Sequence, residues 1–128
     1  STYVAYCFAS IQGFSKMGSF IVNANLDGPF CYCGFRPAYI LVKIYNYGDP
    51  KNWPILNSKM TGYNLDNDAL YANTTAATDT QDTIDFVSNG FKLRRADDTL
   101  NAVPLKYVYA AFAEAPLVNA EGVPVNAR

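Results

Sequence analysis

The chain has 128 residues, of which 50% are hydrophobic, 16% are charged and 15% are aromatic, and its net charge at pH 7 is −1. This length predicts one domain with a sizeable core, and the near-neutral charge excludes the basic stripe of a nucleic-acid-binding protein. Because no run of about 18 apolar residues occurs, no membrane insertion is expected. Ten Tyr and eight Phe with so few charges indicate that part of the surface contacts another subunit or a ligand.

The first half of the chain predicts short strands separated by turns. Thr2–Ala9 is rich in aromatic and β-branched residues and predicts a strand, whereas Gly13–Gly18 predicts a loop. Asp27-Gly28 predicts a turn in which the glycine takes a positive φ. The other strands expected here are Ser19–Val22, Phe30–Gly34, Ala38–Asn46 and Trp53–Leu56.

The second half opens with a polar stretch, Asn57–Thr83, which predicts a long loop in the middle of the domain with one brief strand near Leu70–Ala72. Ser88-Asn89-Gly90 lies between two alternating runs and predicts a hairpin. The strands expected in this half are Ile84–Val87, Phe91–Arg94 and Lys106–Ala113.

These elements predict an all-β, antiparallel β-sandwich, because turns recur every eight to twelve residues or so and no window has helical spacing. We expect residues 1–116 to form a single domain and residues 117–128 to form an extended tail.

The opening of the chain is nearly repeated near its end. Tyr3–Ser10 and Tyr107–Glu114 carry Tyr, Val, Phe and Ala at matching places. Either both ends pair in one sheet, or the chain belongs to a string of similar units.

Three cysteines, Cys7, Cys31 and Cys33, leave one unpaired in any intramolecular scheme. Cys31 and Cys33 are two apart in an expected strand, so both point to one face and do not readily bridge each other. We expect reduced thiols that act as small apolar side chains, with a bridge from Cys7 to either of the others as the alternative.

The chain has no histidine, which excludes Ser–His and Cys–His nucleophile systems and, with only three cysteines, disfavours zinc. No catalytic residue and no cofactor are predicted. Asp66 and Asp68 are candidate calcium ligands, or a carboxylate pair of a glycan-degrading enzyme, although solvated loop acids are the simpler interpretation. Arg94-Arg95 could contact an anionic sugar, and we expect these arginines to pair with Asp97, Asp98 or Glu114.

The best binding candidates are in the loop after the expected strand Ala38–Asn46. Tyr and Trp rings stack on apolar sugar faces, while Asn and Asp side chains hydrogen-bond to hydroxyl groups. The candidate ligand-binding residues are Tyr45, Tyr47, Asp49, Asn52 and Trp53. The alternative is that Tyr45 and Trp53 are core or interface residues.

Several segments resemble a domain that recurs in virion proteins of tailed bacteriophages, often at the C-terminal ends of tail fibres. The segments are Asp27–Ala38, Ile40–Lys43, Ile84–Arg94, Tyr107–Pro116 and Gly122–Arg128. The resemblance implies a jelly-roll-like or concanavalin-like sandwich on the surface of a phage particle, in a homo-oligomer for which a trimer is expected. It supplies no binding residues.

Together these observations predict a non-enzymatic virion module that binds a host-surface glycan or protein, with other virion subunits as partners. The alternative is a structural module for decoration or fibre assembly, whose aromatic side chains serve subunit interfaces.

Overall fold

In the described part of the computed structural model, eight strands are linked by antiparallel pairing. The structure describes residues 1–128 except 46, 49, 50, 61–65, 97–99, 102–104, 120, 122 and 125–128, and it describes only the backbone of 66 and 67. The strands are β1 (Ser15–Ile21), β2 (Phe30–Tyr32), β3 (Pro37–Tyr45), β4 (Pro54–Asn57), β5 (Asp66–Tyr71), β6 (Asp79–Val87), β7 (Gly90–Leu93) and β8 (Lys106–Ala113). Within the described part of the chain, no helix is long and apolar enough to cross a membrane.

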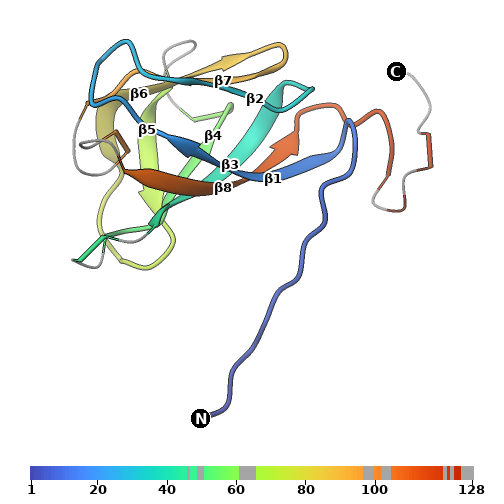
Figure 1. Ribbon diagram of the computed structural model, residues 1–128, viewed down its shortest axis with the longest axis horizontal. Coiled ribbons are helices and arrows are strands. Elements are labelled where there is room, and N and C mark those ends of the chain that lie inside the picture. Colours follow the sequence, from blue (N-terminus) through green and yellow to red (C-terminus); the bar gives the residue numbers. More distant parts are fainter. Residues whose placement is uncertain are drawn as a thin grey trace.

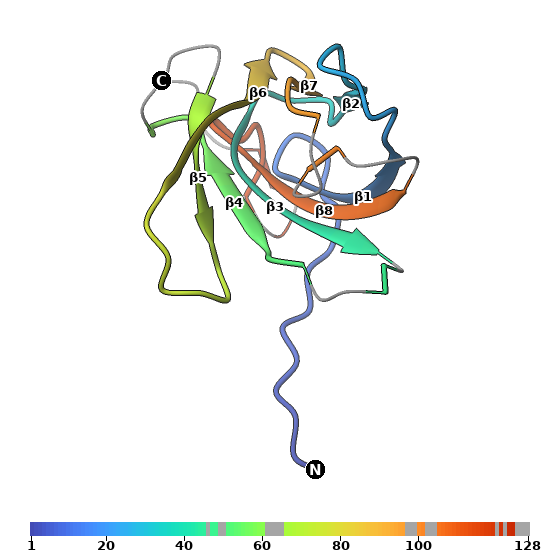
Figure 2. The ribbon, with the colours of Figure 1, turned by 90° about the vertical axis from the view of Figure 1, so that its left-hand side faces the viewer.

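The strands form one sheet in the order β1-β8-β3-β4-β5-β6-β7-β2 (Figure 1). Phe91 of β7 contacts Phe20 of β1 and Tyr109 of β8, with ring centroids 5.9 and 5.3 Å apart. Because β7 is not hydrogen-bonded to β1 or β8 in this order, the three rings meet across the interior. The sheet therefore curls until it is nearly barrel-shaped (Figure 2).

The all-β, antiparallel class predicted from the sequence is confirmed. The division into two packed sheets, which a sandwich requires, stays a prediction, because the pairing runs unbroken from β1 to β2.

The core follows from strand alternation. On β8, Tyr107, Tyr109 and Ala111 point into the curl and are buried. Ile40, Val42 and Ile44 of β3 do the same, and Phe91 and Leu93 of β7 close the interior from the opposite side. The alternate side chains of β3 and β8 point outward, which leaves an outer face available for contacts.

The strand predicted at Thr2–Ala9 is wrong. Residues 1–9 form an exposed, extended segment, here called the N-terminal arm, that runs away from the sheet in both views (Figures 1 and 2). The two ends of the chain therefore do not pair with each other within one copy. The segment has the composition of a strand, but side chains make its hydrogen bonds to the edge strand. The Ser10 hydroxyl bonds to the backbone of Met17, and Ser15 Oγ donates to the carbonyl oxygen of Ala9.

The prediction for Asn57–Thr83 is confirmed in part: a strand lies near Leu70, as β5, and residues 72–78 form a loop, but β5 starts earlier than expected and β6 already begins at Asp79. These strands pair through Asp68↔Thr80 and Ala69↔Asp79, and of the four only Ala69 is buried. The backbone hydrogen bonds between strands do not require apolar side chains. A strand with mostly polar side chains therefore cannot be recognised from the alternation of apolar and polar residues.

Gly28 and Gly90 are both required by close packing of the backbone. The positive φ predicted for Gly28 is wrong, and Gly90 does not have one either; among the described residues, the non-glycine residue with a positive φ is Ala24, at 54°. A Cβ on Gly28 would lie 2.6 Å from the carbonyl oxygen of Leu93, and one on Gly90 would lie 2.0 Å from that of Cys31. Both glycines are thus required by the close approach of a neighbouring backbone.

The hairpin predicted around Ser88-Asn89 is confirmed, since Val87 pairs with Gly90 and Ile84 with Leu93. The cysteines are all free thiols; Cys31 and Cys33 are buried on one face as predicted, whereas Cys7 is exposed on the N-terminal arm.

Buried Asn101 holds the β1–β2 connection. Its Oδ1 accepts hydrogen bonds from the backbone nitrogens of Asn23 and Ala24, at 3.2 and 2.9 Å, and its Nδ2 donates to the carbonyl oxygen of Asn25. We expect Asn101→Ala to lower the free energy of unfolding by about 2 kcal/mol in urea denaturation. The control is Asn119→Ala, which also removes an Oδ1 that accepts from two backbone nitrogens, but at an exposed turn, and should change stability by less than about 0.5 kcal/mol.

Candidate functional site

Four of the five predicted binding residues lie at the junction of β3 and β4. Tyr45 ends β3, Tyr47 follows in the connecting loop, and Asn52 and Trp53 immediately precede β4. The three rings are exposed, Tyr45 by 56%, Tyr47 by 38% and Trp53 by 41%, so the core interpretation of Tyr45 and Trp53 is wrong. The fifth candidate, Asp49, lies outside the described residues.

A lysine ammonium group lies against each of these rings. Lys43 Nζ is 5.5 Å from the ring centroid of Trp53. Lys51 Nζ is 5.2 Å from that of Tyr47, and Lys106 Nζ is 5.9 Å from that of Tyr45. These separations are within the range of cation–π attraction. We call the six side chains the aromatic–lysine surface: Lys43, Tyr45, Tyr47, Lys51, Trp53 and Lys106.

Strand register explains how these residues come together. Lys43 and Tyr45 are two apart on β3 and share its outer face, and Lys106 of β8 is the register partner of Tyr45. Lys43 also donates a hydrogen bond to the carbonyl oxygen of Lys51, which connects the strand to the loop. The rigid sheet thus positions one half of the surface and the loop supplies the other half.

Asn52 and Asn73 fix the backbone at Trp53. The Trp53 nitrogen donates to Asn73 Oδ1 at 2.9 Å, and Asn73 Nδ2 donates to Asn52 Oδ1 at 3.1 Å. The Trp53 carbonyl oxygen accepts from the nitrogen of Ala72 at 3.0 Å. Asn52 therefore has a positioning role that the sequence prediction, which assigned it to ligand contact, did not foresee.

Beside Trp53 the outer face of the sheet is slightly hollowed. Leu41, Lys43, Val108 and Ala110 line a shallow depression of about 170 Å³ against the indole. Its surface is almost wholly apolar apart from the Lys43 ammonium, so it suits the C–H face of a ring more than a strongly hydrated group.

The predicted calcium and carboxylate candidates, Asp66 and Asp68, both lie on β5, and their role stays a prediction. Asp68 is half-buried on β5, a register irregularity separates it from Asp66, and the Asp66 side chain is not described. No group of three or more His, Cys, Asp or Glu side chains that could hold a metal ion occurs in the described ranges.

The buried thiols are poor nucleophiles. Burial raises the pKa of Cys31 to about 12 and that of Cys33 to about 11. Both groups are therefore protonated at neutral pH and shielded from solvent, which is the state of a structural cysteine.

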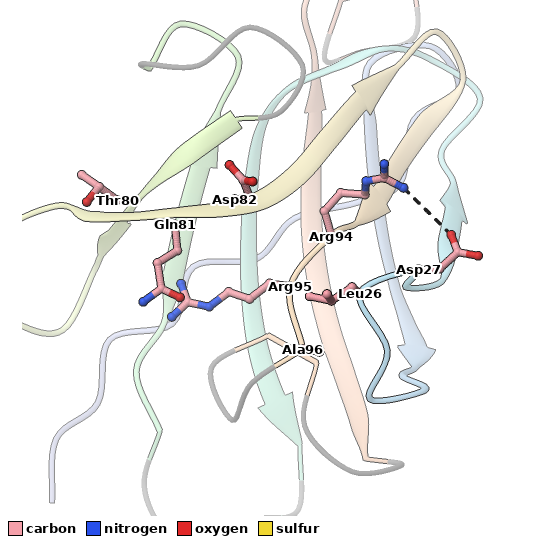
Figure 3. Close-up of a pocket in the computed structure, with 8 residues that line it drawn as sticks. All are labelled: Leu26, Asp27, Thr80, Gln81, Asp82, Arg94, Arg95 and Ala96. Atoms are coloured by element: carbon pink, nitrogen blue, oxygen red, sulfur yellow. Dashed lines mark ion pairs between the residues drawn. The ribbon is translucent and has the colours of Figure 1, made fainter.

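A larger polar hollow, of about 890 Å³ and open to solvent, lies on another part of the surface (Figure 3). Its arginines are paired: Arg95 Nη1 is 2.7 Å from Asp79 Oδ2, and Arg94 Nε is 3.2 Å from Asp85 Oδ2. Arg94 also faces Asp27 at 3.9 Å, as the dashed line in Figure 3 marks. Because carboxylates already neutralise both guanidinium groups, this hollow is a weaker candidate for an anion.

The arginine partners differ in part from those expected. Glu114 pairs with Arg36 and Lys59, at 3.0 and 3.2 Å, and not with the Arg94-Arg95 pair. Asp97 and Asp98 lie outside the described residues.

The family model described as "Domain of unknown function (DUF7483)" matches residues 1–116. The chain belongs to the DUF7483 family. The DUF7483 match includes the N-terminal arm, the whole sheet and the aromatic–lysine surface. No curated protein and no solved structure matches the chain.

The arrangement on this DUF7483 domain combines stacking with positive charge. Exposed rings offer flat apolar contact, and the ammonium groups of Lys43 and Lys106 offer charge-assisted hydrogen bonds to anions. Sequence reasoning found the rings but missed the lysines. The alternation of Lys43 with Tyr45 was a usable signal; the approach of Lys106 was not, because it depends on the register of β3 with β8.

Proposed function

We propose that this domain is a non-enzymatic surface module of a tailed-phage virion that binds an acidic polysaccharide of the host surface through the aromatic–lysine surface. The observation that carries the proposal is the placement of a lysine ammonium group 5.2 to 5.9 Å from each of three exposed ring centroids. Within a chain whose net charge is −1, this is a local concentration of positive charge on an aromatic surface.

The proposed ligand class follows from the contact between the Lys43 ammonium group and the Trp53 ring, because a bound sugar would compete with that ammonium group for the ring face. An uncharged sugar that stacks on Trp53 has to share the ring with the Lys43 ammonium or displace it. A sugar that carries a carboxylate, sulfate or phosphate group can instead use that ammonium as a hydrogen-bond donor while its C–H face contacts the indole. Acidic glycans are therefore favoured over neutral ones of the same size.

The resemblance stated above supports the virion setting, and repetition in a homo-oligomer such as a trimer would raise the avidity of weak individual sites. We also propose that the curled sheet is a β-sandwich of the jelly-roll or concanavalin-like kind. In such a sandwich, β1, β8, β3 and β4 would form one layer and β6, β7 and β2 the other, with β5 joining them in the observed strand order.

We expect Trp53→Ala and Lys43→Met each to weaken binding of an acidic polysaccharide by about tenfold or more, measured by calorimetry or biolayer interferometry at low salt. Lys43→Met keeps the aliphatic stem and removes the charge, so it should reduce the preference for acidic over neutral glycans. Binding should also weaken as salt rises, because exposed charges are screened.

The matched controls are Tyr32→Ala, at an exposed tyrosine on β2, and Lys16→Met, at an exposed lysine on β1. Both should bind as the unmodified chain does. Equal binding of acidic and neutral polysaccharides, or unchanged binding by both Trp53→Ala and Lys43→Met in folded protein, would contradict the proposal.

A structural role in virion assembly is the second candidate. The observation that favours it is the exposed N-terminal arm, whose apolar side chains are typical of a segment that contacts another subunit. In that case isolated protein should self-associate and should neither bind host cells nor compete with infection.

A further inference from the structure

The N-terminal arm is unusually apolar for an exposed segment. Residues 1–10 contain no charged residue, no proline and no glycine, the features that natural proteins use to keep an exposed strand from pairing with another chain. Its large side chains are strongly exposed: Tyr3 by 87%, Val4 by 79%, Tyr6 by 82% and Phe8 by 64%. Such a segment is suited to bury these groups against a second surface.

The arm has the sequence pattern of a strand that already pairs with β1. Tyr3-Val4 matches Tyr107-Val108, and Phe8-Ala9 matches Phe112-Ala113. In β8, this pattern runs antiparallel to β1, with Val108 opposite Ser19 and Phe112 opposite Ser15. The residue types of the arm are therefore compatible with a place beside β1.

The outer side of β1 is an edge of the sheet. The backbone of Ser15 bonds outward to Ile11, and that of Met17 bonds outward to the Ser10 hydroxyl. Because backbone groups alternate in direction along an antiparallel strand, those of Ser19 and Ile21 also point outward. No described residue supplies these outward groups of Ser19 and Ile21 with a hydrogen bond.

The arm of the same copy does not cover this part of the edge. Ser10 Oγ accepts from the Met17 nitrogen at 2.9 Å, and Ser15 Oγ donates to the carbonyl oxygen of Ala9 at 2.7 Å. These side-chain bonds replace the backbone ladder, and the arm leaves the edge there. Phe8 then packs on Phe112, at 5.7 Å between centroids, and residues before it extend away from the body (Figures 1 and 2).

We propose that the N-terminal arm of one copy adds as an antiparallel strand to the outer edge of β1 in a second copy, where it pairs with Ser19 and Ile21. This contact gives the outward backbone groups a partner and covers the Ile21 side chain, which is 67% exposed. Electrostatic repulsion does not oppose it, since the arm is uncharged and Lys16 is the one charged residue of β1.

The test compares oligomeric state by light scattering and analytical ultracentrifugation. The full chain and Ser19→Ala should self-associate with concentration, whereas a chain without residues 1–9 and the Ser19→Pro variant should be monomeric. Proline at Ser19 removes an outward N–H that has no internal partner, so the thermal melt should stay close to that of Ser19→Ala. If Ser19→Pro does not fold, Ile21→Lys blocks the same edge with a charge.

A mixing experiment separates this contact from other forms of association. The chain without residues 1–9 keeps the edge but has no arm, whereas Ser19→Pro keeps the arm but has no usable edge. We expect these two monomeric variants to form a one-to-one complex when they are mixed. Neither variant should associate with itself when it is alone. A monomeric full chain at high micromolar concentration, self-association that survives arm deletion, or self-association that survives blocking of the edge would each overturn the proposal.

Discussion

Gly90→Ala is expected to destabilise the fold by about 3 kcal/mol or more. The alanine Cβ would lie 2.0 Å from the carbonyl oxygen of Cys31 and 3.0 Å from its carbonyl carbon. Both are backbone atoms of the neighbouring strand β2, so no side-chain rotation relieves the overlap. The pairing of Tyr32 with Gly90 and of Cys31 with Phe91 has to open, which exposes the buried thiol and part of the Phe91 ring.

The measurement is urea denaturation followed by far-ultraviolet circular dichroism, with Gly48→Ala as the matched control. A Cβ on Gly48 has no atom within 4 Å, so that variant should stay within about 0.5 kcal/mol of the original chain. Equal stability of the two variants would show that β2 does not approach β7 as closely as described.

Asp79→Asn is expected to lower the free energy of unfolding by about 2 to 3 kcal/mol at neutral pH. Asp79 Oδ2 accepts hydrogen bonds from Arg95 Nη1 at 2.7 Å and from the Tyr71 hydroxyl at 2.8 Å. The Arg95 side chain is only 8% exposed, so its charge has little access to water when the carboxylate is removed. Arg95→Met on top of Asp79→Asn should restore part of the loss, because no buried charge then remains.

This effect depends on pH with a definite sign. Burial alone would raise the pKa of Asp79, but the hydrogen bonds from Arg95 and Tyr71 and the charge of Arg95 outweigh it, so the pKa lies below its ordinary value of 3.8. The carboxylate therefore stabilises the fold above about pH 4, and this contribution is lost as pH falls through the lowered pKa.

The difference between Asp79→Asn and the original chain should accordingly shrink in acid. Asp85→Asn is the matched control on the same strand: its partner Arg94 is 38% exposed, so we expect a loss of less than about 1 kcal/mol. An Asp79→Asn effect that is the same at neutral and strongly acidic pH would contradict this account of the ion pair.

The strands that could be predicted are those in which the alternation of side chains along the sequence matches the inward and outward faces of the strand in the fold. Lys106–Ala113 was predicted with its observed bounds, because alternating aromatic and small residues match the inward and outward faces of β8. The β6–β7 hairpin was predictable because apolar runs lie on both sides of a short turn. In each case the same residues that favour a strand also fill the core.

The predictions are wrong where the pairing of a segment with neighbouring strands, and not its own residue pattern, determines whether it forms a strand. The N-terminal arm looks like β8 but has no sheet neighbour, whereas β5 is polar and yet is paired on both sides. β1 begins at Ser15 and not at Ser19, with Gly18 inside it; a Cβ there would lie 2.9 Å from the Tyr109 ring. The need for a glycine at that position depends on a residue far along the chain, so local sequence could not indicate it.

Part of the candidate site could likewise be predicted from local sequence, and part of it could not. Aromatic and amide residues clustered in one loop pointed to Tyr45, Tyr47 and Trp53 as binding candidates, and all three side chains are exposed. The charge on that location depends on Lys106, which β8 brings to Tyr45 from the other end of the chain. The proposed ligand class therefore depends on the strand register, whereas the proposed location does not.

The position of β8 between β1 and β3 has a consequence for how the chain folds. The strand between β1 and β3 is the last one in the sequence, and its pairing joins Ser15 to Phe112. Neither of its neighbours can complete its ladder until the residues of β8, Lys106–Ala113, have been synthesised. Such distant partners require the closure of a long loop before any contact is gained, so refolding should take milliseconds to seconds, and a chain cut before Lys106 should remain open.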